Sequence, residues 1–478
     1  MTTPRVTADT AVRVADRLRP VEPPWDVYGE RIVTHEVHFG PRGVELVRGP
    51  LVLEGYGVRL LRPKEGKTAI GFNASTDTSD SGVAEVLAGA QSVARYSEFP
   101  AKDVQLPSGA GAGSPAPAVV DPHLWDNAPL ALAQWTGALF AAFERSPDAS
   151  VSFGSVKSRR VEATLSNSAG LSTGYAHTEV ELEVAIKSAG GPEGAPAGEY
   201  WVTSFARRLE PERLPELAEQ WSRFARDARH ARPPPTGDLN VVLPPNVLEA
   251  ILPQALSFKL SGRGRLRELS PAPGAEVASE GVDLFDDGTL PWAIGSSPVD
   301  DEGIPQRRRA LIESGKSSEL LYDTLYANAL GGVTSGNGLR AGLDLTGRER
   351  FARIPGPACT TVSIPAGSGG SDRELIEAAG DGIWIQQIGW PSPDPITSGF
   401  GGEIRIGYRI RNGKLAEPVR GGTVGGLVLG PPGAPSLLAN ISVVGSSPVL
   451  TGGVSVPPLL VRGLTVAGED VPGATASA

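Results

Sequence analysis

Histidine and cysteine, two residue types that commonly bind metals, are scarce in this chain of 478 residues. The five histidines are His35, His38, His123, His177 and His230. His35 and His38 stand in the segment THEVH, but residues three apart on a strand point to opposite faces and cannot share an ion without a bend. We interpret His177 and His230 as structural. The single cysteine, Cys359, excludes an internal disulfide, and we expect a buried thiol without a chemical role.

Two acidic clusters offer further candidate ligands. They are DLFDDGTLP, with Asp283, Asp286 and Asp287, and SSPVDDEGIP, with Asp300, Asp301 and Glu302. Four or more such oxygens could hold magnesium or calcium. Asp also opens turns by accepting bonds from its own backbone, and both clusters precede Gly or Pro, so we favour turns with solvated charge. The arginines at 307–309 are expected to pair with these acids rather than with a ligand.

The elements that position these residues follow from the periodicity of apolar side chains. Between Trp25 and Asn73, β-branched clusters separated by turn signals predict a meander of antiparallel strands. Helices are predicted to begin near Ser81, to cover the segment before Phe143, and to run from about Glu212 to His230. Their inner faces are Val83, Val86, Leu87, Ala90 and Val93; Leu132, Trp135, Leu139 and Phe143; and Leu214, Leu217, Trp221, Phe224 and Ala228. In VELEVAI, the residues Val180, Leu182, Val184 and Ile186 alternate with Glu181 and Glu183, which predicts a strand with one buried face.

A run of prolines divides the chain. ARPPPTGD, at 231–238, ends the preceding helix and stiffens a connector. We therefore expect an N-terminal α+β domain at 1–232, a Pro-rich linker at 233–238, and a C-terminal domain at 239–478 that is mostly β and ends in a frayed tail. In the second domain, Ile404, Ile406, Tyr408 and Ile410 share one face before an Asn412-Gly413 turn of type I′.

The overall charge limits the class of partner. The formal net charge is -10, which argues against a nucleic-acid surface. The first twenty residues have no continuous apolar run, and an 18-residue apolar span is absent from the sequence, so we expect a cytoplasmic protein that does not bind membranes.

A family resemblance rests on an ordered set of motifs. DDGT, GSSPVDDEGIP, LIESG, LYD and TSGNG follow one another between residues 286 and 338. This order resembles the central signature of the TldD/PmbA family, described as gyrase modulators and peptide-processing metalloproteases. The resemblance extends back to VVLPPNVLEAILPQALSFKLSG and forward to VPPLLVRGLTVAG. It implies an α+β fold in which a curled antiparallel sheet with packed helices precedes a β-rich, barrel-like or sandwich domain.

The resemblance also locates a zinc site. In the family's protease subunit a helix carries H-E-x-x-x-H, whose histidines bind zinc and whose glutamate activates water. Aligned on Ser261-Gly262, this chain has Pro253 and Phe258 in place of the histidines and Gln254 in place of the glutamate. None of these can do that chemistry. The family's zinc-binding cysteine is also missing from the matching stretch, SVVGSSPVLTGG. We expect no catalytic residues and no zinc or other cofactor on this chain.

Three functions remain open. The resemblance favours the TldE (PmbA) branch, a non-catalytic subunit that pairs with a zinc-bearing TldD-like subunit in a heterodimeric metalloprotease. An extended, unfolded or modified peptide would be the substrate, bound along a sheet edge. The alternatives are a stand-alone member that acts on or binds a peptidic natural product without zinc, and a structural or regulatory binder. Our candidate substrate-binding residues are Trp390, Thr397, Ser398, Gly399 and Asn337. For Trp390 we favour core packing over ligand contact.

Overall fold

The computed structural model of the chain describes residues 9–109, 116–146, 148–189, 197–340, 349–431 and 434–468. The predicted frayed tail lies outside these residues. Within the described ranges, no helix is both long and apolar enough to cross a membrane.

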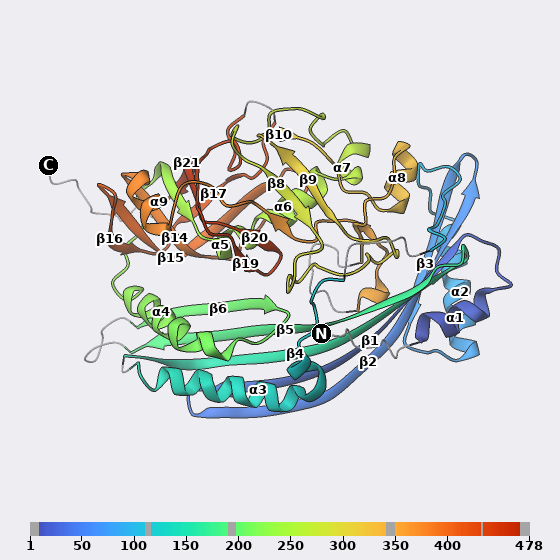
Figure 1. The fold of residues 1–478 in the computed structure, drawn as a ribbon, viewed down its shortest axis with the longest axis horizontal. Coiled ribbons are helices and arrows are strands. Elements are labelled where there is room, and N and C mark those ends of the chain that lie inside the picture. The colour runs from blue at the N-terminus through green and yellow to red at the C-terminus, as the bar shows by residue number, and fades with distance from the viewer. Residues whose placement is uncertain are drawn as a thin grey trace.

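The N-terminal part is built on one antiparallel sheet of long strands. In spatial order β3-β2-β1-β4-β5-β6, these are β3 (Lys67–Ser75), β2 (Gly43–Lys64), β1 (Trp25–Gly40), β4 (Ala149–Asn167), β5 (Ser172–Ser188) and β6 (Gly198–Ala206). The sheet curls beneath the C-terminal part of the chain (Figure 1). The predicted meander is confirmed, and β6 forms one edge of the sheet, on the side that faces the C-terminal part.

Helices pack on this sheet through the apolar faces expected of them. They are α1 (Thr10–Leu18), α2 (Asp80–Ala94), α3 (Pro122–Phe143), the 3₁₀ turn η1 (Pro211–Arg213) and α4 (Leu214–Asp227). Leu132, Trp135 and Leu139 of α3 share one core with Trp221 and Phe224 of α4 and with apolar residues of β1, β4 and β5. The prediction was wrong for Val93, which is 49% exposed, because the last turn of α2 directs Ala90 and Ala94 towards β3 and leaves Val93 on the solvent side.

The C-terminal part contains a closed barrel. Its wall is the cycle β14 (Gly382–Gly389), β7 (Gly237–Leu243), β21 (Leu459–Ala467), β17 (Thr423–Leu427) and β15 (Gly399–Arg411), closed by pairing of β15 with β14. β16 (Lys414–Val419) extends β15, and β18 (Ile441–Val444) pairs with β21. The predicted hairpin turn is confirmed, since Asn412 and Gly413 have φ of 50° and 71°, as a type I′ turn requires.

A second sheet lies beside the barrel. In spatial order it contains β10 (Lys316–Ser317), β9 (Arg308–Glu313), β8 (Leu284–Asp287), β13 (Val362–Ser363), β20 (Val454–Val456) and β19 (Val449–Thr451). A short pair is formed by β11 (Gly338–Leu339) and β12 (Gly356–Pro357). The remaining elements are α5 (Pro245–Glu249), α6 (Leu252–Lys259), α7 (Gly262–Leu266), α8 (Thr324–Leu330), η2 (Arg350–Ala352) and α9 (Asp372–Ala379).

One apolar core joins the barrel, the second sheet and the helices between them. It includes Leu248 of α5, Leu256 of α6, Leu311 of β9 and Val461 of β21, all fully buried. The predicted α+β class, with a curled antiparallel sheet and a β-rich, barrel-containing second part, is therefore confirmed. The division into domains at 233–238 stays a prediction. β7 begins inside that segment, at Gly237.

Candidate functional site

The acidic signature is buried, and our expectation of solvated charge was wrong. Asp286, Asp300, Asp301 and Glu302 are each at most 6% exposed. The turn interpretation was right in its geometry, since Asp300 Oδ1 accepts bonds from the backbone N–H groups of Glu302 and Ile304, both at 2.9 Å. Asp300 therefore forms the hydrogen bonds of a turn and is also buried, because the curled sheet covers this turn.

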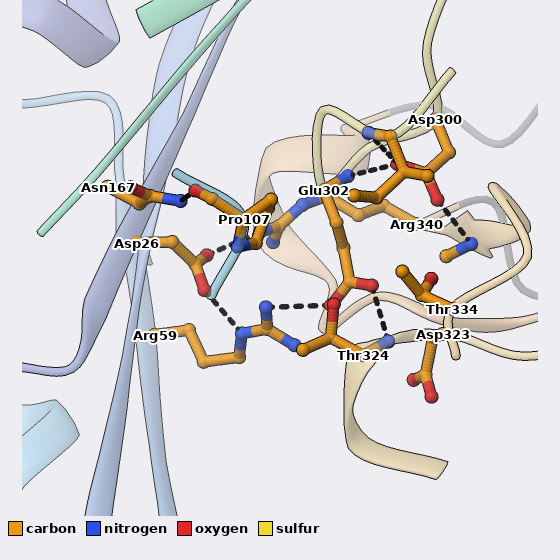
Figure 2. A network of polar contacts seen from close by, with 12 residues as sticks. Asp26, Arg59, Pro107, Asn167, Asp300, Glu302, Asp323, Thr324, Thr334 and Arg340 are labelled. Carbon is orange, nitrogen blue, oxygen red and sulfur yellow. Dashed lines mark hydrogen bonds and ion pairs between the residues drawn. The ribbon is translucent and has the colours of Figure 1, made fainter. Parts of the chain in front are cut away.

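The buried acids join the two parts of the chain through ion pairs (Figure 2). Arg59 of β2 donates from Nε to Asp26 of β1 at 2.6 Å and from Nη2 to Glu302 at 2.8 Å. Arg340 Nη2 lies 3.1 Å from the other oxygen of Asp26. Glu302 also accepts from the backbone N–H of Thr324 at 2.7 Å. Burial would lower the pKa of Arg59, but Asp26 and Glu302 outweigh it and raise that pKa.

The carboxylate oxygens of this network already have hydrogen-bonding partners. The oxygens of Asp300 and Glu302 are already occupied by backbone N–H groups and by Arg59. Among the residues that the structure describes, no group of three or more His, Cys, Asp or Glu could hold an ion. We expected the arginines at 307–309 to pair with these acids, but among them only Arg308 does so, with its Nε 3.9 Å from Asp287 Oδ2. Arg309 instead donates hydrogen bonds to Glu319 and to the Ser335 carbonyl. These contacts agree with a structural role for the network.

His177 belongs to a second buried polar cluster. Its Nε2 lies 2.9 Å from Glu179 Oε1, and its ring is 1% exposed. Burial and the nearby Arg207 lower the pKa of His177 to about 3, so the imidazole is neutral. This environment agrees with a structural role.

Helix α6 lies at the position that the family resemblance gives to the zinc motif. Phe258 is 7% exposed and packs beneath the guanidinium of Arg267, 5.7 Å from the ring centroid. Pro253 stands in the first turn, where its carbonyl accepts a bond from Ser257 Oγ at 2.7 Å. Neither side chain has a donor atom for zinc, and the amide of Gln254 cannot act as a general base. The residues on α6 therefore do not fit a zinc site.

A groove lies between the free edge of β6 and the C-terminal part. It has a volume of about 570 Å³ and is lined by β6, by α5, by the end of β14 and by the β19–β20 turn. In Figure 1, β6 lies at the edge of the curled sheet, opposite these elements of the C-terminal part. The side chains that bound the groove include two tryptophans, Trp201 of β6 and Trp390 after β14, which are 43% and 74% exposed.

The floor of the groove is a row of main-chain polar groups. β6 pairs with β5 on one side, and no other described strand pairs with its second side. In an antiparallel ladder, alternate residues direct both N–H and C=O away from the partner. Gln387 Nε2 donates to the Trp201 carbonyl, which places Trp201 in the outward set together with Glu199, Thr203 and Phe205. All four line the groove.

The walls of the groove carry charges of both signs. Arg405 lies over the Trp390 ring, 4.0 Å from its centroid, and its Nη1 is 3.6 Å from Glu403. Glu249 of α5 is partly buried, and this burial raises its pKa to about 7. A hydrogen bond from the backbone N–H of Gly453 has the smaller, opposite effect of lowering that pKa. At neutral pH, a substantial fraction of Glu249 is therefore protonated.

Of the predicted substrate-binding residues, only Trp390 lies in this groove. Its exposure contradicts the core packing that we favoured, and its backbone has a φ of 45°, uncommon for a bulky residue. Ser398 is fully buried and bonds the Ala255 carbonyl, while Asn337 is 2% exposed and bonds Asp286. Their assignment, and that of Thr397 and Gly399 beside Ser398, stays a prediction.

Sequence reasoning missed the contribution of β6. Trp201, Thr203 and Phe205 were not singled out, because alternation within one strand does not reveal which edge of a sheet is free. Glu249 and Gln387 lie in segments already assigned to the family resemblance, but nothing in those segments shows that they meet β6, which Gln387 contacts across 186 positions of sequence.

Comparison with known proteins gives a family match for the C-terminal region. Residues 236–468 match the family model described as the PmbA/TldA metallopeptidase C-terminal domain. This region of the chain belongs to the PmbA/TldD family, as the signature predicted. A Haemophilus influenzae relative named metalloprotease TldD homolog is 32% identical over 194 residues, which cover 40% of this chain and 38% of the relative. An Archaeoglobus fulgidus protein named metalloprotease is 29% identical over 210 residues, covering 42% and 45%. The matched stretch thus spans less than half of these relatives.

Solved structures share the fold over nearly the whole chain. TldE from Thermococcus kodakarensis superimposes with a TM-score of 0.74 and 18% identity, covering 97% of this chain and 100% of that one. A Thermotoga maritima protein described as a candidate modulator of a DNA gyrase gives a TM-score of 0.76 and 18% identity, covering 96% and 99%. At this identity the likeness concerns the fold.

Proposed function

We propose that this chain is a non-catalytic TldE/PmbA-like subunit that pairs with a zinc-bearing TldD-like subunit. Together they would form a heterodimeric metalloprotease that cleaves unfolded or modified peptides. The observation that carries the proposal is the chemistry of α6. At the positions that correspond to the family's zinc motif, this helix has Pro253, Gln254 and Phe258, which supply neither zinc ligands nor a general base.

Two further observations support the proposal. Curated relatives of the C-terminal region are named metalloproteases, so the family context is peptide hydrolysis. The chain also contains a groove with a row of main-chain donors and acceptors on its floor, which suits sequence-tolerant recognition of peptides. A subunit that contributes such a surface can shape a substrate chamber without performing chemistry.

The test is reconstitution with a TldD-like subunit from the same genome. Native mass spectrometry should show one copy of each chain, and the zinc should be lost when the TldD-like glutamate–histidine motif is mutated. Cleavage of an unfolded casein fragment should require both chains. The proposal fails if no complex forms, or if cleavage by the TldD-like subunit is the same with and without this chain.

The same experiment distinguishes the alternatives. Turnover of a peptidic natural product by this chain alone, without zinc, would assign it to a stand-alone role. Peptide binding without any complex or turnover would leave a regulatory binder.

A further inference from the structure

The free edge of β6 is unprotected. Proteins commonly block an exposed edge with Lys, Pro or a bulge, because an unpaired row of N–H and C=O groups is a template for another strand. β6 reads GEYWVTSFA and contains neither Lys nor Pro, and its pairing with β5 runs from Gly198 to Ala206 without a register shift. The edge is therefore regular over its whole length.

The edge also lines the groove of about 570 Å³. The residues with outward main-chain groups, from Glu199 to Phe205, all line the groove. At about 3.3 Å per residue, this stretch spans roughly 20 Å, which corresponds to six or seven residues of an added strand. The Gln387 amide occupies one of the outward carbonyls, that of Trp201, as the N–H of an incoming strand would.

The groove walls favour apolar side chains on such a strand. Trp201 and Trp390 expose large fractions of their indole rings in the same groove, and Phe205 lines it as well. Trp390 is held in the left-handed backbone region, which is strained for a bulky residue. Such strain is concentrated at ligand clamps, and here it accompanies an aromatic ring that faces solvent rather than the core.

We infer that the groove binds an extended peptide that adds to β6 as a seventh strand, with an apolar side chain against Trp201 and Trp390. The inference rests on the proposed function for the class of ligand, an unfolded or modified peptide. It goes further by assigning the binding edge and the residues that receive the peptide. Glu249 and Arg405 flank the peptide, and Gln387 releases the Trp201 carbonyl when the peptide enters.

Binding is tested with this chain alone. The probe is a fluorescein-labelled, end-blocked heptapeptide of Ser, Thr, Leu and Phe, followed by anisotropy up to about 1 mM. A second heptapeptide has the same side chains with every backbone nitrogen methylated. We expect saturable binding of the first and at least about tenfold weaker binding of the second, since strand addition needs the peptide N–H groups. Absence of binding, or equal binding of both peptides, would overturn the inference.

A matched pair of variants tests the edge itself. Thr203→Pro removes an N–H that points away from β5 and should weaken the heptapeptide at least about tenfold, whereas Thr203→Ala keeps that N–H and should bind as the parent does. Trp390→Ala, at an exposed position, should weaken binding about fivefold or more. Equal affinity of the two Thr203 variants, with unfolding temperatures like the parent's, rules out pairing at β6.

The outcomes separate this inference from the proposed function. If the heterodimer cleaves casein equally well with Thr203→Pro and with Thr203→Ala, the subunit role is supported and peptide binding at β6 is refuted. If this chain forms no heterodimer but binds the heptapeptide in a way that depends on Thr203, peptide binding at β6 is supported and the subunit role is refuted.

Discussion

Gln387 donates a hydrogen bond from its side-chain Nε2 to the main-chain carbonyl oxygen of Trp201. This contact ties the end of β14 in the barrel to the free edge of β6 in the curled sheet. It shows which residues of β6 direct their peptide groups into the groove, and it occupies the place where an added strand would bond.

Gln387→Ala should leave peptide binding intact or tighten it up to about threefold, because the variant no longer competes for the Trp201 carbonyl. The lost bond should lower the free energy of unfolding by about 1 kcal/mol or less. Anisotropy with the heptapeptide and urea unfolding measure the two effects. A loss of affinity beyond about tenfold would mean that Gln387 itself contacts the peptide.

Glu249→Gln should stabilise the chain in a pH-dependent way. The folded pKa of about 7 lies above the ordinary value of 4.5, because burial disfavours the charge. Below pH 4.5 both states are protonated; as the pH rises towards 7, the unfolded chain ionises first and stability is lost. The variant should therefore gain little at pH 5 and about 2 kcal/mol at pH 8 relative to the parent.

Urea unfolding of both chains at pH 5 and pH 8 measures this difference. Other groups that titrate in the range are common to both chains and cancel. Glu377→Gln, on the exposed face of α9, controls for the loss of one negative charge. A stability difference at Glu249 that is the same at both pH values would contradict the assignment.

Arg59→Met should lower the free energy of unfolding by about 3–5 kcal/mol, because it leaves the carboxylates of Asp26 and Glu302 buried without their shared cation. Denaturant unfolding followed by far-UV circular dichroism gives the value. Arg373→Ala removes an exposed ion pair with Glu377 and should change stability little. If both variants are equally stable, the network of Figure 2 does not hold the two parts together.

Cys359 should be unreactive while the chain is folded. Burial, with a smaller effect of Asp286, raises the pKa of its thiol well above the ordinary value, and the side chain is 1% exposed. Since the thiolate is the reactive form, a disulfide reagent should modify the native protein slowly and the urea-unfolded protein rapidly. Cys359→Ala supplies the blank. Fast and complete labelling of the native protein would show that the thiol is accessible.

Local sequence was enough for the elements and for the family. The strand at VELEVAI, the helical spacing of Leu132, Trp135 and Leu139, and the Asn412-Gly413 turn are decided within a few residues, and each appears as predicted, although Ala185 shows that the second face of the strand is also partly buried. The ordered signature between residues 286 and 338 resembled the family whose model matches residues 236–468, because its motifs follow one another within a short stretch of the sequence.

Only the tertiary structure decided where charge and groove would lie. Asp300 and Glu302 have the sequence environment of an exposed turn, and they are buried because the curled sheet brings Arg59 over them from 243 residues away. The groove likewise depends on which edge of a sheet remains unpaired and on what faces it, since β6 meets α5 and β14 only after the chain has folded back. The spacing of apolar residues predicts which face of a helix or strand is buried, whereas the packing of the whole chain determines which other elements lie beside it.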